Sequence, residues 1–102
     1  MFDSPAFELP PSFVALYTAP HRARLTVDRE TLLQRYELCE DLAQMLTTTA
    51  GEMQWSLGIA ESDVLQRCHR GLLGEAAVVS DAEAQWVVSR LAELMGWPFP
   101  NW

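Results

Sequence analysis

The sequence contains no lysine, and all seven of its basic residues are arginine. It also contains no G-x-G-x-x-G, G-x-S-x-G or H-E-x-x-H motif. A P-loop needs a lysine at the β- and γ-phosphates, a protein kinase needs a strand lysine, and pyridoxal-phosphate enzymes need a Schiff-base lysine. These absences exclude three large enzyme classes, and we expect a protein that is not an enzyme.

Long apolar runs are also absent, because no stretch of the sequence approaches the roughly 18–20 residues that a membrane span requires. Residues 1–11 carry two acidic residues and no basic one, unlike the cationic start of a signal peptide. Two cysteines without an export signal are expected to be thiols in a reducing compartment. The sequence therefore predicts a cytoplasmic protein with no membrane partner.

Acidic residues dominate the charge of this 102-residue chain, since fourteen Asp and Glu give a formal net charge of −7. Nucleic-acid binding depends on Lys and Arg that neutralise phosphates, so no nucleic-acid partner is expected. Apolar residues make up 49% of the chain and charged residues 21%, which is typical of a globular domain and not of a disordered chain. We interpret the acidic residues as a solvated surface that slightly favours basic partners.

A helical pattern begins at Asp28, which is a good N-cap residue. Apolar or small residues then recur at alternating spacings of four and three as far as position 57, which predicts one long helix over 28–57. Thr47–Thr49 and Gly51 are poor helix formers within this range, but the register continues across them.

Two further helices and a short one complete the prediction. A helix over 61–73 ends before Gly74, and a capping box over 80–83 begins a helix that ends at Gly96. Residues 12–17 are too few for periodicity to decide between a short helix and a strand-like arm, and we favour a short helix that ends before Pro20. The sequence thus predicts an all-α, single-domain helical bundle over 1–102, with three main helices plus a short N-terminal one, an irregular arm over 1–11 and an aromatic, proline-rich tail over 97–102.

Cys68 is the first candidate site residue, because Arg67, His69 and Arg70 beside it could lower the pKa of its thiol. It also lies on the apolar stripe of its predicted helix, where a cysteine behaves as a small hydrophobic residue. Cys39, Cys68 and His69 could together form a thiol- or metal-dependent sensor, which we keep as an alternative. The spacing matches no known zinc motif, so no metal or cofactor is expected.

A second alternative is a small enzyme that uses Arg67, His69, Arg70 and a carboxylate on a phosphorylated or acidic substrate, because arginine clusters bind such groups. Catalysis would require a carboxyl group with a raised pKa in an apolar environment. The acidic residues on the polar face of the predicted long helix are instead expected to be solvated: Glu37, Glu40 and Asp41.

Aromatic residues near the two ends are the remaining candidates. The tail could fold back as a lid on the bundle, which we favour, or it could be a docking segment for a partner. Trp55 and Trp86 are predicted to pack at the edge of the core. The candidate partner-binding residues are Trp97, Phe99, Trp102, Phe13 and Tyr17.

Three segments carry a resemblance to a known family: LPPSFVALY at 9–17, RYELCEDLA at 35–43 and DVLQRCHRGLL at 63–73. The chain resembles a group of small proteobacterial proteins often labelled "ATPase with chaperone activity", over residues 9 to about 98. The resemblance implies a bacterial protein with a chaperone-like role in protein binding, and it implies no catalytic residues.

From these features we expect a non-enzymatic protein-binding adaptor, regulator or chaperone-like factor. The apolar stripe of the predicted long helix is wide, and two shorter helices would leave part of it uncovered. Self-association is therefore expected as a further property.

Overall fold

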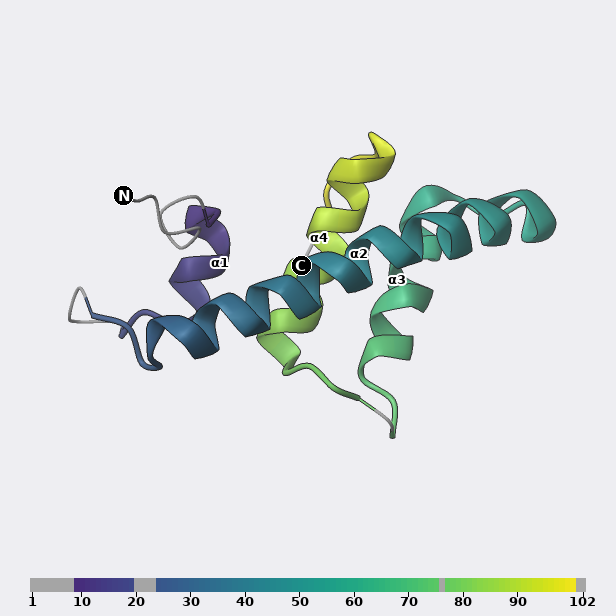
Figure 1. Cartoon of the computed structure of the whole chain (residues 1–102). Coiled ribbons are helices and arrows are strands. Elements are labelled where there is room, and N and C mark those ends of the chain that lie inside the picture. Colours follow the sequence, from purple (N-terminus) through teal and green to yellow (C-terminus); the bar gives the residue numbers. More distant parts are fainter. Residues whose placement is uncertain (1–8, 20–23, 76, 101–102) are drawn as a thin grey trace. The chain divides into compact units, whose positions relative to one another are not determined.

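The computed structural model describes residues 9–19, 24–75 and 77–100, and within these ranges it contains helices and no strand (Figure 1). One isolated antiparallel bridge joins Thr18 to Leu25. None of the described helices is both long and apolar enough to cross a membrane. The predicted all-α class is confirmed, with three main helices and a short N-terminal one: α1 (Pro11–Leu16), α2 (Arg29–Leu57), α3 (Glu61–Leu72) and α4 (Asp81–Met95).

Helix α2 is one continuous helix of 29 residues, as predicted. At its start the carboxylate of Asp28 accepts a hydrogen bond of 2.8 Å from the backbone N–H of Thr31, which satisfies one of the amides that lack a helical partner. The three threonines and the glycine in its second half do not interrupt it. The helix ends before Gly58, whose φ of 62° is easily reached only without a side chain.

The chain divides into two compact units, residues 1–38 (unit 1) and 39–102 (unit 2), and α2 contributes to both. In unit 1 the side chain of Phe13 is fully buried. Its ring centroid lies 5.7 Å from that of Tyr17 and 5.5 Å from that of Tyr36, so α1 packs on α2 through an aromatic cluster. Proline at the first position of α1 has no N–H to leave unsatisfied and therefore suits this place.

The core of unit 2 forms where α3 packs against α4 and against Ala50 of α2. The buried residues of α3 and α4 recur at spacings of three and four, so that each helix turns one apolar stripe inward. Half-buried side chains, including Trp97, surround this cluster. Its buried members are Ala50, Val64, Leu65, Cys68, Val88, Leu91 and Ala92.

The predicted capping box begins α4. The backbone N–H of Glu83 donates to the hydroxyl of Ser80 at 3.1 Å, and the N–H of Ser80 donates to the carboxylate of Glu83 at 2.9 Å. Two amides that would otherwise lack partners are satisfied reciprocally.

Replacement of Ser80 by alanine removes one of these bonds and is expected to lower the free energy of unfolding by about 1 kcal/mol. Ser80→Thr keeps a hydroxyl at this position and is expected to retain most of the stability. Urea denaturation of both variants tests this, and equal stability of Ser80→Ala and the natural chain would contradict it.

The direction of the chain after α4 is set by Gly96, whose φ is 72°. The N–H of Trp97 donates to the carbonyl of Ala92 at 2.9 Å and the N–H of Gly96 to that of Glu93, the pattern of a Schellman motif. This turn brings Trp97 against the core of unit 2, where its side chain is half-buried. Residues 98–100 then continue the segment.

The prediction for the two central tryptophans is half right. Trp86 is buried, but Trp55 is 90% exposed, so its predicted place at the core edge is wrong. Trp55 lies two heptads after Asp41 and therefore on the polar face of α2, opposite the buried Ala50. Met45 on the same helix is also exposed.

Candidate binding pocket

An open pocket of about 370 Å³ lies in unit 2 between the first turns of α3 and the segment that follows α4. This volume is near the lower end of the range for ligand pockets, about 300–1,000 Å³. We call it the α3 pocket, and the residues that line it are Ala60, Glu61, Ser62, Leu65, Gln66, Pro98, Phe99 and Pro100.

The apolar part of the α3 pocket is attached to the core. Leu65 is almost completely buried and belongs to the core cluster of unit 2. Phe99 is 66% exposed, although it lines the pocket. The prolines on either side fix their own φ angles near −65°, and this restricts the backbone that carries Phe99. The pocket therefore combines a fixed apolar wall with an aromatic ring whose surface is largely in water.

The polar part comes from the first turns of α3. Glu61, Ser62 and Gln66 line the pocket, and the side chain of Glu61 is half-buried. Among the described residues, none forms a hydrogen bond or an ion pair with the Glu61 carboxylate. The pocket thus offers one negative group beside apolar surface.

The structure separates the five predicted partner-binding residues. In the segment after α4, Trp97 packs on the core as a lid residue would. Phe99 lines the α3 pocket but stays largely exposed. Trp102 lies outside the described residues. Phe13 is fully buried, and Tyr17 is half-buried beside it, so these two rings stabilise unit 1.

Leu65, Glu61 and Gln66 were not identified from the sequence as site residues. They resemble any other turn of an amphipathic helix, and only contact with residues 98–100 makes them part of a pocket. In the sequence, the aromatic residues after Gly96 were the only signal that a binding site lies here.

The thiol-sensor alternative depends on reactive cysteines, and the structure buries both. Cys39 and Cys68 are thiols without a disulfide. Burial raises the pKa of Cys68, whereas a reactive thiol needs a lowered one. His69 is half-buried. No three metal-binding side chains come together anywhere in the described ranges.

We expect both thiols of the native protein to react with Ellman's reagent at least about 100-fold more slowly than those of the urea-unfolded chain, because labelling requires opening of the core. The unfolded protein, which should give two thiols, is the control. Rapid labelling of either cysteine in the native state would contradict this and would support the sensor alternative.

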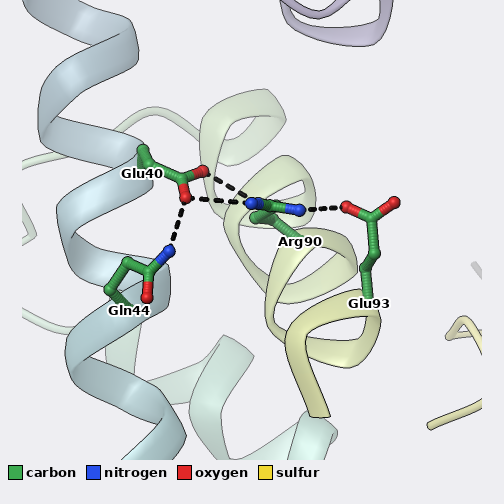
Figure 2. A network of polar contacts seen from close by, with 4 residues as sticks. All are labelled: Glu40, Gln44, Arg90 and Glu93. Atoms are coloured by element: carbon green, nitrogen blue, oxygen red, sulfur yellow. Dashed lines mark hydrogen bonds and ion pairs between the residues drawn. The ribbon is translucent and has the colours of Figure 1, made fainter. Parts of the chain in front are cut away.

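The predicted acidic face of α2 is only partly solvated. Glu37 and Asp41 are exposed as expected, but Glu40 forms a network with α4 (Figure 2). Arg90 donates to both oxygens of Glu40, at 2.9 and 3.1 Å, and also to Glu93. Gln44 donates to Glu40 at 2.8 Å. This two-pronged ion pair fixes α4 against the part of α2 that belongs to unit 2. The two arginines proposed for phosphate binding, Arg67 and Arg70, are exposed on α3.

The network also shifts the pKa of Glu40. Desolvation raises this pKa, but the hydrogen bonds from Arg90 and Gln44 and the charge of Arg90 together outweigh it, and the pKa falls below its ordinary value of 4.5. Since the folded state binds the proton less tightly than the unfolded state, the carboxylate stabilises the fold above pH 4.5. That contribution is lost as the pH falls through the lowered pKa.

The substitution Glu40→Gln is therefore expected to cost about 1–2 kcal/mol of unfolding free energy at pH 7, because both partners are partly exposed. The difference from the natural chain should shrink as the pH falls towards 3. Glu37→Gln removes the same charge from an exposed position and serves as the control. A difference that stays constant between pH 7 and pH 3 would contradict the assignment.

Comparisons with protein-family models, curated proteins and solved structures find no match for this chain. The resemblance to chaperone-labelled proteobacterial proteins therefore stays a prediction.

Proposed function

We propose that the protein is a non-enzymatic binding module, an adaptor or chaperone-like factor of the bacterial cytoplasm, and that its α3 pocket takes an apolar side chain of a partner polypeptide. One observation carries the proposal. Phe99 stays 66% exposed beside an apolar pocket, although the adjoining Trp97 packs on the core.

The exposure of the Phe99 ring to water is energetically costly. Full burial of a phenylalanine side chain contributes roughly 1.5–3 kcal/mol, and Phe99 realises only part of that in the isolated chain. A partner side chain in the α3 pocket would cover Phe99 and meet Leu65, which the core already holds in place. Such preorganised aromatic positions dominate binding energy at protein interfaces.

The test is affinity capture of partners from lysate of the native cell, with tagged full-length protein and two single-site variants. Phe99→Ser removes the exposed ring, whereas removal of everything after Gly96 would also take Trp97 from the core. Trp55→Ser removes a more exposed aromatic side chain from α2 and is the matched control.

We expect a stoichiometric partner that binds the natural chain and Trp55→Ser, and that binds Phe99→Ser at least about tenfold less, a loss of 1.4 kcal/mol. If capture of the partner depends on Trp55 and not on Phe99, the binding surface lies on α2 and the proposal is contradicted. A partner that binds all three forms equally, or no partner at all, would also contradict it.

A further inference from the structure

We infer that the segment received by the α3 pocket carries a basic residue next to its apolar side chain, and that Glu61 pairs with this basic residue. The inference rests on the proposed function and specifies the chemistry of the partner. It follows from the surroundings of Glu61 and from the distribution of charge over the chain.

The state of Glu61 is the first argument. Its side chain is half-buried at the wall of the α3 pocket, and no described residue neutralises it. An apolar side chain that fills the pocket would remove more water from this carboxylate. Desolvation of a charge is costly unless an opposite charge compensates for it. A cation beside the apolar side chain supplies this compensation through a charge-assisted hydrogen bond.

None of the arginines that the structure describes in unit 2 already serves this purpose. Of the three arginines in unit 2, Arg90 is bound to Glu40 and Glu93 (Figure 2). Arg67 and Arg70 do not line the α3 pocket. In the proposed complex, a cation of the partner takes this position.

The charge of unit 2 is the second argument. Residues 39–102 contain nine acidic residues and three arginines, whereas residues 1–38 contain five acidic residues and four arginines. The negative charge of the chain is thus concentrated in the unit that contains the α3 pocket. A basic segment would be attracted by this field and an acidic segment repelled, which favours the same partner that Glu61 selects.

A matched peptide series tests the inference. Three capped pentapeptides have a central phenylalanine flanked on both sides by arginine, by glutamine or by glutamate. Each is titrated into the ¹⁵N-labelled full-length protein, and the backbone amides of Leu65, Gln66 and Phe99 report on the α3 pocket.

We expect the arginine peptide to bind about tenfold more tightly than the glutamine peptide, and the glutamate peptide to bind most weakly. In Glu61→Gln this preference for arginine should fall to about threefold or less. Asp63→Asn removes the same charge from the same turn of α3, at an exposed position that does not line the pocket. It should keep the preference, and thermal unfolding of both variants checks that they fold.

The outcomes separate this inference from the proposed function. Equal binding of all three peptides, lost in Phe99→Ser, would overturn the inference and leave the proposed function standing. If Glu61→Gln and Asp63→Asn lose the preference for the arginine peptide equally, the preference comes from the overall charge of the protein. That result would also overturn the pairing with Glu61. If no peptide shifts these amides at millimolar concentration, both the inference and the proposed function are contradicted.

Discussion

Replacement of Phe13 by alanine is expected to destabilise unit 1 by about 3–5 kcal/mol. The side chain is fully buried, and its ring packs on Tyr17 and Tyr36. Alanine would leave a cavity between α1 and α2 and would remove both ring contacts. Since α1 has only six residues, it is too short to persist without this packing.

Hydrogen exchange measures this effect locally. We expect the amides of α1 to lose protection in Phe13→Ala, while Gln34→Ala, at an exposed position of α2 in the same unit, keeps it. Unchanged protection of α1 would show that the aromatic cluster does not hold it. It would also make Phe13 a candidate partner-binding residue again.

Replacement of Leu91 by alanine is expected to cost about 2–5 kcal/mol in unit 2. Leu91 is fully buried in the cluster formed by α3, α4 and Ala50. The exact loss depends on how far the neighbouring helices can close the cavity. Because α3 also provides one wall of the α3 pocket, this substitution should weaken the pocket as well as the core.

Tryptophan fluorescence is the suitable signal, because all four tryptophans of the chain belong to unit 2. The urea midpoint should fall strongly in Leu91→Ala and hardly at all in Met45→Ala, whose side chain is 70% exposed. Similar midpoints for the two variants would contradict the packing described for unit 2.

The helices could be predicted because their signals are local. The spacing of apolar residues determined the extent of α2, and Ser80 and Glu83 determined the start of α4 through bonds within one turn. Such signals depend on neighbours three or four residues away, and these are visible in the sequence. The continuous register through Thr47–Thr49 outweighed their low helix propensity because tertiary packing contributes more than propensity.

The sites were harder to predict because they depend on distant residues. The pairing of Glu40 with Arg90 joins residues fifty positions apart, and nothing near Glu40 in the sequence distinguishes it from its solvated neighbours. The α3 pocket similarly requires Leu65 and Phe99 to meet. Trp55 illustrates the opposite error, since hydrophobicity alone suggested burial while its heptad position placed it on the polar face.

The most direct test of the α3 pocket as a binding site is photo-crosslinking in the native cell. A photoreactive phenylalanine analogue, p-benzoylphenylalanine, replaces Phe99 in one strain and Trp55 in another. On irradiation, the account predicts a discrete crosslinked product with another polypeptide from position 99 and none from position 55. The absence of a product at position 99, or the same product from both positions, would contradict it.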